Sequence, residues 1–181
     1  MMLNQTGNQV VLVDEHGKQV GVAEKLAAHE AGQLHLAFSV MIYRETEQGA
    51  EYLLQKRAMD KYHSGGLWTN TCCSHPGVNE TIESAAKRRL YEELGIDAPL
   101  PLALGERFIY RAELDNQLVE HELDQIVLCR VDEVSVYPNP EEVMDYRWWR
   151  SEDIARARME DPAQFTAWFG DVMDRINPSL A

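Results

Sequence analysis

Cysteine, basic residues and long hydrophobic runs are all scarce in this sequence. Its three cysteines include the adjacent pair Cys72 and Cys73, a poor disulfide framework that favours a reducing compartment. With 17 Lys and Arg against 30 Asp and Glu, the net charge of −13 argues against nucleic acid or an anionic membrane as a partner. The most apolar stretch, residues 36–43, is too short to span a bilayer, and residues 1–13 lack the features of a signal peptide. These absences predict a cytoplasmic protein that binds neither nucleic acid nor membrane.

The remaining composition fits one compact domain spanning residues 1–181. Hydrophobic residues make up 45% of the chain, and no repeat, low-complexity tract or linker interrupts it. Hydrophobic patterning and turn residues predict strands at 9–13, 19–23, 36–44, 52–57, 104–111, 119–131 and 145–149, and helices at 24–31 and 81–94. We expect Ser151 to cap a further helix, and Asp161, followed by Pro162, to cap the terminal one. This order of elements predicts an α+β fold, an α/β/α sandwich around a mixed sheet.

Three carboxylates alternate along one predicted strand. Glu120, Glu122 and Asp124 stand at i, i+2 and i+4, so a strand points all three to one face. Such a face is ordinary on a solvent-exposed edge strand. If it is not exposed, the like charges repel unless cations or protons compensate them. The pattern alone leaves both interpretations open.

Three histidines favour a metal site over a solvent-exposed polar face. His29, His35 and His75 lie close in sequence to the other candidate residues, although each alone is more typical of a surface or hydrogen-bonded histidine. Their spacing matches no compact zinc-finger signature. Mixed imidazole and carboxylate ligation would suit zinc, manganese or iron, and the sequence does not choose among them.

The two adjacent cysteines should face opposite ways on a short strand. A free cysteine is most often a small buried hydrophobe, and we assign that role to Cys72. Cys73 lies two residues before His75 and after the polar segment 68–71, which we expect to be a turn. A thiol and a carboxylate that face one substrate would provide paired acid and base chemistry.

Four basic residues accompany these motifs, although most lysines and arginines are solvated surface groups. They are Lys25, Arg57, Lys61 and Arg89. None stands out individually. In so acidic a chain, however, a cluster of them would form a specific anion site, with phosphate or diphosphate as its natural ligand.

The helix predicted at 81–94 carries an altered form of a known motif. RRLYEELGI (residues 88–96) resembles the core of a Nudix box, with Glu80 as the upstream acid. Ser74 stands where the box has its first glycine, and Arg89 replaces a metal-binding glutamate. Arg89 and Glu93 are i, i+4 neighbours, so the exchange removes a carboxylate from the metal-facing side and adds a diphosphate donor. Hydrolysis that needs several magnesium ions is therefore disfavoured.

Four further segments complete a resemblance to type 1 isopentenyl diphosphate isomerases. They are KLAAH (25–29), LHLAFS (34–39), LWTNTCCSHP (67–76) and EVMDY (142–146). The resemblance extends from about residue 10 to at least residue 168. It implies a Nudix-like fold and the interconversion of isopentenyl and dimethylallyl diphosphate in isoprenoid biosynthesis.

The resemblance also implies a role for each candidate residue. One divalent metal, Mn²⁺ or Zn²⁺, would be bound by His29, His35, His75, Glu120 and Glu122. Glu93 would hold a Mg²⁺ that touches the substrate diphosphate, with Lys25, Arg57, Lys61 and Arg89 as further donors. Cys73 and Glu122 would lie on opposite faces of the five-carbon unit, with Tyr110 assisting Glu122 and Trp168 stabilising a carbocation.

Two other functions fit parts of the pattern. A Nudix hydrolase of nucleoside diphosphate derivatives would share the fold, although Arg89 argues against it. A non-catalytic metal-binding module would share the histidines and carboxylates, and it would give Cys73 no reactive role. Whatever its function, we expect the protein to be a monomer or a weak homodimer.

Overall fold

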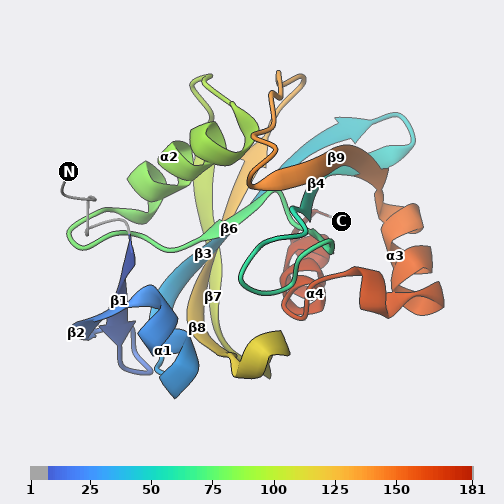
Figure 1. Ribbon diagram of the computed structural model, residues 1–181. Helices are drawn as coiled ribbons and strands as arrows, with labels where there is room; N and C mark the ends of the chain where they lie inside the picture. Colours follow the sequence, from blue (N-terminus) through green and yellow to red (C-terminus); the bar gives the residue numbers. More distant parts are fainter. Residues whose placement is uncertain (1–7, 181) are drawn as a thin grey trace.

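The computed structural model describes residues 8–180, which fold around a mixed nine-stranded sheet (Figure 1). The strands are β1 (Gln9–Val13), β2 (Gln19–Glu24), β3 (His35–Thr46), β4 (Gly49–Arg57), β5 (Trp68–Thr69), β6 (Cys72–Ser74), β7 (Leu102–Glu113), β8 (Val119–Arg130) and β9 (Val143–Arg150). The helices are α1 (Lys25–Ala31), α2 (Ile82–Leu94), α3 (Ser151–Glu160) and α4 (Phe169–Leu180). The α+β class predicted from the sequence is confirmed.

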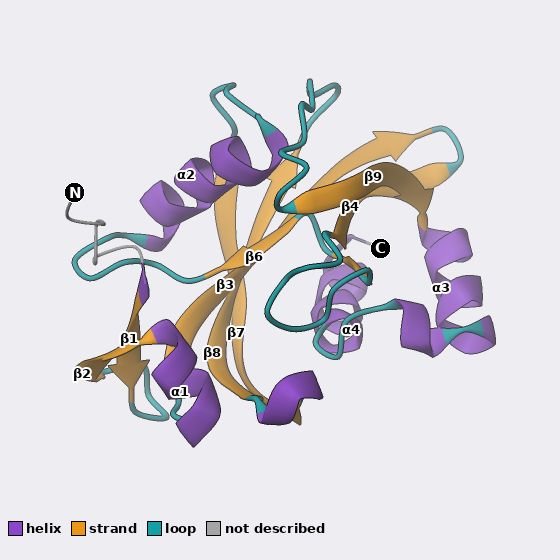
Figure 2. Ribbon diagram, in the orientation of Figure 1, coloured by secondary structure: helices purple, strands orange, loops and turns teal. Residues whose placement is uncertain are grey.

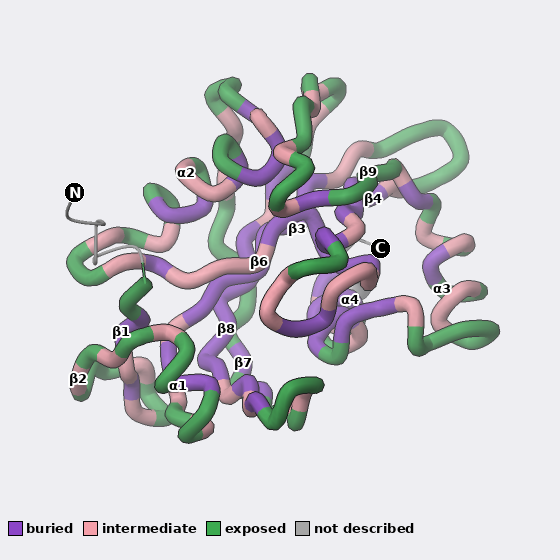
Figure 3. The backbone as a smooth tube through the Cα atoms, in the orientation of Figure 1, coloured by how far each residue is buried: buried purple, intermediate pink, exposed green. Residues whose placement is uncertain are grey.

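Strand β3 is the hub of the sheet. It pairs antiparallel with β1, β4 and β6, and parallel with β8 over nine residues from His35↔Glu122 to Tyr43↔Arg130. On its other side β8 pairs with β7, while β9 pairs with β4. Figure 3 shows buried residues concentrated along β3 and β8. Side chains at the start of these two strands therefore lie side by side in the interior.

Two hydrophobic clusters cover opposite faces of the sheet. Val40 and Ile42 belong to a cluster with Leu90 of α2, whereas Met41 belongs to a cluster with Val172 of α4. This alternation follows from the two-residue period of a strand. Figure 2 shows α2 on one side of the strands and α3 and α4 on the other, which is the predicted α/β/α layering.

Helix α2 forms as the sequence predicts. The Thr81 hydroxyl oxygen accepts from the backbone N–H of Ser84 at 3.1 Å, and Gly95 ends the helix with φ of 61°. A Cβ at Gly95 would lie 2.5 Å from the carbonyl oxygen of Tyr137. Only glycine therefore allows the chain to leave the helix here and the 137–142 loop to pack against it.

Two expectations for the C-terminal third are wrong. Arg150, not Ser151, is the N-cap of α3, because β9 stays paired with β4 up to that residue. Pro162–Gln164 form only a short 3₁₀ turn, since Phe165 then bridges to Trp68 at the sheet and ends it. Helix α4 accordingly starts at Phe169, and Trp168 lies just before the helix instead of within it.

The segment 68–71, expected to be a turn, instead begins with β5. Trp68 and Thr69 pair with Lys56 and Gln55 of β4.

None of the helices within residues 8–180 combines the length and apolar character that crossing a membrane requires. The single-domain organisation, the cytoplasmic location and the oligomeric state stay predictions.

Candidate active site

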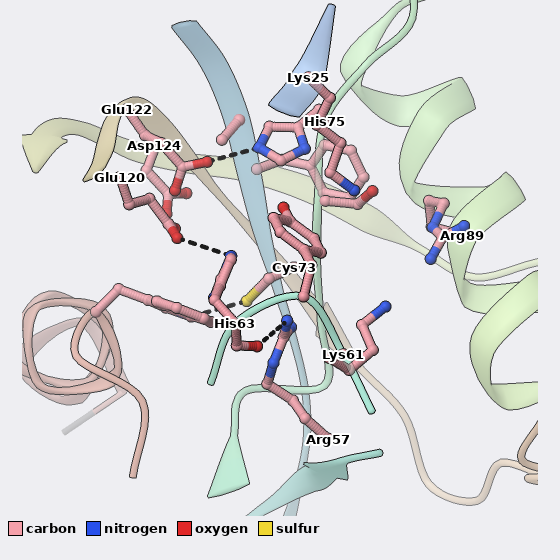
Figure 4. Close-up of a pocket in the computed structure, with 15 residues that line it drawn as sticks. Lys25, Arg57, Lys61, His63, Cys73, His75, Arg89, Glu120, Glu122 and Asp124 are labelled. Atoms are coloured by element: carbon pink, nitrogen blue, oxygen red, sulfur yellow. Dashed lines mark hydrogen bonds and ion pairs between the residues drawn. The ribbon is translucent and has the colours of Figure 1, made fainter. Parts of the chain in front are cut away.

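A pocket opens where β3, β6 and β8 meet the loop 58–67. In the view of Figure 4 the carboxylates of β8 lie on one side, Lys61 and Arg89 lie on the other, and Cys73 lies between them. The lining comes from segments far apart in sequence, which the pairing of β3 with β6 and β8 brings together. The pocket is therefore built by the sheet topology and not by one local motif.

The three alternating carboxylates of β8 face this pocket. Glu120, Glu122 and Asp124 are 4%, 4% and 2% exposed, because β8 lies between β3 and β7. An exposed edge strand is thereby excluded. Burial and the neighbouring charge of Glu122 raise the pKa of Glu120 well above its usual range. Burial, again with the charge of Glu122, raises the pKa of Asp124 to about 8.

Glu122 is the carboxylate that stays ionised. Its burial opposes ionisation, but hydrogen bonds with Glu120, His35 and His75 hold its pKa well below its usual range. The His75 Nε2 atom lies 2.8 Å from Glu122 Oε2, and His35 Nε2 lies 3.3 Å from the same oxygen. These hydrogen bonds therefore favour the ionised form of Glu122 in the pocket.

The three predicted histidines converge on this charge. His29 and His35 place their Nδ1 atoms 2.7 and 2.8 Å from the carbonyl oxygens of Lys25 and Gln33, which leaves both Nε2 atoms to face inward. One ligand atom from each of His29, His35 and His75 lies within 4.8 Å of the others. The buried His29 Nε2 has no hydrogen-bond partner among residues 8–180. An unpartnered imidazole nitrogen beside buried carboxylates fits a divalent metal. The backbone carbonyls that accept from the Nδ1 atoms orient the histidine rings, as they do in known metal sites.

His63 is the residue that sequence reasoning missed. It is 3% exposed, and its Nε2 lies 3.3 Å from Glu120 Oε2. With His29 and Glu120 it forms a second group whose ligand atoms lie within 4.8 Å of one another. Burial and the nearby Arg57 charge lower the pKa of His63 to about 2, so the ring is neutral. Its position two residues after Lys61, already a candidate, was the only signal in the sequence.

Cys73 and Cys72 point in opposite directions, as predicted. Trp168 Nε1 donates to Cys73 Sγ at 3.0 Å, and the Cys73 thiol donates to Asn70 Oδ1 at 2.8 Å. Burial and the charge of Asp124 raise the pKa of the Cys73 thiol well above its ordinary value. Cys73 therefore enters the pocket as a protonated thiol, while Cys72 is buried on the other face.

Two predicted site residues, Glu93 and Tyr110, are buried next to residues that line the pocket but do not line it themselves. Glu93 is buried and accepts a hydrogen bond from Cys72 Sγ at 2.8 Å, with Arg89 Nε 3.5 Å away. Tyr110 pairs with Glu122 across β7 and β8, and its buried hydroxyl has no hydrogen-bond partner among residues 8–180. Burial and the nearby carboxylates Glu120 and Glu122 raise the pKa of Tyr110, so its hydroxyl keeps its proton.

The four basic residues do form a cluster. Lys25, Arg57, Lys61 and Arg89 all line the pocket. Burial and the other three cations lower the pKa of Lys25 to about 8. Glu142 forms ion pairs with Lys61 and, at 3.5 Å, with Arg89 Nη2. Arg89 also pairs with Glu92 at 2.7 Å and with Glu93 at 3.5 Å. A pocket lined by four cations suits a multivalent anion.

The comparisons with known proteins agree with this geometry. The NUDIX domain family matches residues 33–169. An isopentenyl-diphosphate Delta-isomerase of Photobacterium profundum is 54% identical over 173 residues, which cover 96% of each chain. One from Pectobacterium atrosepticum is 47% identical over 93% of this chain and 90% of that relative. Among solved structures, DR0079 of Deinococcus radiodurans aligns with a TM-score of 0.72 over 92% of this chain and 98% of that chain. The two sequences are only 16% identical, so this likeness shows the fold alone. The chain therefore belongs to the isopentenyl-diphosphate Delta-isomerase family of NUDIX domain proteins.

Proposed function

We propose that this protein interconverts isopentenyl and dimethylallyl diphosphate in isoprenoid biosynthesis. The observation that carries the proposal is a thiol, Cys73, and a carboxylate, Glu122, in one buried pocket with a cluster of four cations. The names of relatives that are up to 54% identical support the same reaction. We further propose a cytoplasmic monomer or weak homodimer without nucleic-acid or membrane partners.

The reaction needs two proton carriers. Its alkene is unactivated, so an acid must protonate the terminal carbon and form a tertiary carbocation. A base must then remove a proton from the allylic carbon next to the one that bears the diphosphate. Glu122, assisted by Tyr110, delivers the first proton in our proposal, and the Cys73 thiolate accepts the second.

Two pKa shifts favour one end of that cycle. Burial raises the pKa of the Cys73 thiol, and hydrogen bonds to Glu122 hold its pKa low despite burial. A protonated thiol with an ionised carboxylate is the state left after isopentenyl diphosphate has been converted, and the state from which the reverse reaction starts. The Trp168 N–H at 3.0 Å from Cys73 Sγ would also stabilise the thiolate that the forward direction requires.

A divalent metal, Mn²⁺ or Zn²⁺, would be held by His29, His35, His75, Glu120 and Glu122. When bound, it supplies positive charge that orients Glu122 and tunes its acidity. Burial lowers the pKa of His75 to about 3, which keeps its ring in the neutral form that metals require.

The substrate diphosphate would lie against the basic cluster of Lys25, Arg57, Lys61 and Arg89. Glu93, which lies beside Arg89, would hold a Mg²⁺ shared with the diphosphate. Trp168 is 2% exposed and lines the pocket, so its ring can face the five-carbon unit. An aromatic face contributes on the order of 2 kcal/mol to a desolvated cation.

Conversion and hydrolysis can be separated in one test. Purified protein with Mn²⁺ and Mg²⁺ is incubated with isopentenyl diphosphate, and products are followed by proton NMR alongside a phosphate-release assay. Dimethylallyl diphosphate without phosphate release supports the proposal. Phosphate release from nucleoside diphosphates, with isopentenyl diphosphate unchanged, would favour the hydrolase instead.

A further inference from the structure

We propose that His63 is a fourth imidazole ligand of the divalent metal, in addition to the five side chains named above. The inference rests on the metal centre of the proposed function and extends it. His63 lies in the loop 58–67 between β4 and β5, and Figure 4 shows its ring directed towards Glu120. The ring is buried, and its Nε2 lies 3.3 Å from Glu120 Oε2.

This contact is incomplete without a cation. Glu120 Oε2 has no hydrogen-bond partner among residues 8–180, so the approach of the ring does not satisfy the oxygen. His29 Nε2, less than 4.8 Å from both donor atoms, is equally buried and equally unpartnered. A buried polar atom left unpaired destabilises the folded protein. One cation bound by these three side chains would satisfy both orphaned atoms.

The two donor groups must share one ion. His29 belongs to the group with His35 and His75, and also to the group with His63 and Glu120. Its Nδ1 atom already contacts the Lys25 carbonyl oxygen at 2.7 Å, so only Nε2 can bind a metal. A single nitrogen coordinates a single ion. His63 therefore joins the predicted ligands on the same ion and does not create a second site.

The position of His63 is held by its surroundings. Its Nδ1 atom lies 2.9 Å from Ser64 Oγ, which leaves Nε2 for the metal. Arg57 Nη2 donates to the His63 carbonyl oxygen at 3.1 Å, and the Ser64 N–H donates to Asp115 Oδ1 at 3.2 Å. Ser64 also adopts a positive φ of 55°, a conformation that side-chain-bearing residues rarely take. This loop is thus fixed around the histidine by contacts on both sides.

Six side chains would then surround the ion. They are His29, His35, His63, His75, Glu120 and Glu122. A complete set of donors leaves no position for substrate, which is the arrangement of structural metal sites. Six donor side chains favour a metal ion that accepts six ligands over zinc, which prefers four. The metal then orients Glu122 without binding the five-carbon unit itself.

The test counts histidine ligands in protein loaded with Co²⁺. Each ligating imidazole gives one strongly shifted, exchangeable N–H resonance in the proton NMR spectrum. We expect four such signals in the unmodified protein and three in His63→Ala and in His63→Gln. We also expect the dissociation constant for Mn²⁺ to rise at least about tenfold in both variants.

The control variant is His121→Ala. His121 lies on β8 between Glu120 and Glu122 in sequence. Its Nδ1 atom, however, lies 3.1 Å from the Gly32 carbonyl oxygen and does not face the pocket. It should leave four signals and the Mn²⁺ affinity unchanged. Three signals in the unmodified protein, or a count unaffected by either His63 variant, would overturn the inference while the five-ligand centre stands. The absence of any shifted signal would overturn both.

Discussion

The two halves of the pocket handle their charge in opposite ways. The histidine–carboxylate half consists of His29, His35, His63, His75, Glu120, Glu122 and Asp124. The basic half consists of Lys25, Arg57, Lys61 and Arg89. The first half is deeply buried and keeps unpaired atoms, among them His29 Nε2 and Asp124 Oδ1. The second half also contains atoms without a hydrogen-bond partner among residues 8–180, Arg57 Nε and Arg89 Nε, but two of its cations have acidic partners. Lys61 pairs with Glu142, and Arg89 pairs with Glu142, Glu92 and Glu93.

The difference indicates what each half is built to receive. Buried donors without partners are costly unless a ligand neutralises them permanently, as a resident metal does. Cations that pair with carboxylates such as Glu142 can exchange that partner for a substrate anion in every cycle. We therefore propose that the histidine–carboxylate half is a permanent metal site and that the basic half binds its ligand reversibly.

The largest effect is expected from Glu122→Gln. This change removes a proton carrier and a metal ligand, so turnover should fall by on the order of 10⁴-fold, the upper range for general acid catalysis. Binding of inorganic diphosphate, measured by calorimetry, should stay within a factor of two because the basic half is intact. Turnover close to that of the unmodified protein would remove Glu122 from the mechanism.

Cys73→Ala should have the next largest effect. The thiol is the only proton carrier that we place opposite Glu122, and turnover should fall by about 10²–10⁴-fold. Cys129→Ala is the matched control, since Cys129 is buried among the hydrophobic residues packed under α2. Equal rates in the two variants would contradict the role of Cys73 and revive the non-catalytic metal-binding module.

Metal removal should lower stability as well as activity. Chelator-treated protein should gain about 2.7 kcal/mol in its free energy of unfolding when Mn²⁺ is added at 100 times its dissociation constant. The gain, read from urea titrations, should be lost in His35→Ala. An unfolding midpoint that does not respond to metal would contradict a permanent site in the histidine–carboxylate half.

Glu142→Gln tests the basic half by removing a carboxylate that pairs with two of its cations. Without this carboxylate, Lys61 and Arg89 lose one anionic partner, although Arg89 keeps Glu92 and Glu93. Inorganic diphosphate should therefore bind about two- to fivefold more tightly. Glu141→Gln, at an exposed neighbouring position, serves as the control. Weaker binding in Glu142→Gln would show instead that the carboxylate holds the two cations in place.

A smaller effect of pH is expected in the basic half. Because the pKa of Lys25 is lowered to about 8, its positive charge is present below that pH and is lost above it. Affinity for inorganic diphosphate should therefore decline between about pH 7.5 and pH 9. Lys25→Arg should bind with little change over that interval, since arginine stays charged. Equal pH profiles would assign the decline to another group.

Local patterns in the sequence predicted most elements of the fold and the direction of several site residues. The alternation of Glu120, Glu122 and Asp124 was enough to place them on one face, and the glycine after α2 was enough to end that helix. The start of α4 was not predictable from Asp161 and Pro162, because Phe165 is drawn to the sheet by a contact with Trp68 that is distant in sequence.

Site residues were predictable from the sequence only where they belong to short recognisable motifs. His63 was missed because its role depends on the fold of the loop 58–67, which sets the ring against β8. Glu142 begins the EVMDY segment, but it was missed as a partner of the cations for the same reason. Long-range pairing of β3 with β8 is what brings such residues together.

The most direct test of the central claim is proton NMR of isopentenyl diphosphate in heavy water, with the metal-loaded protein and Mg²⁺. A two-carrier mechanism places solvent deuterium in the newly formed methyl group as dimethylallyl diphosphate appears. We predict that deuterium enters this methyl group with the unmodified protein and that Cys73→Ala and Glu122→Gln each abolish the exchange. Unchanged isopentenyl diphosphate in the presence of fully loaded protein would contradict the account.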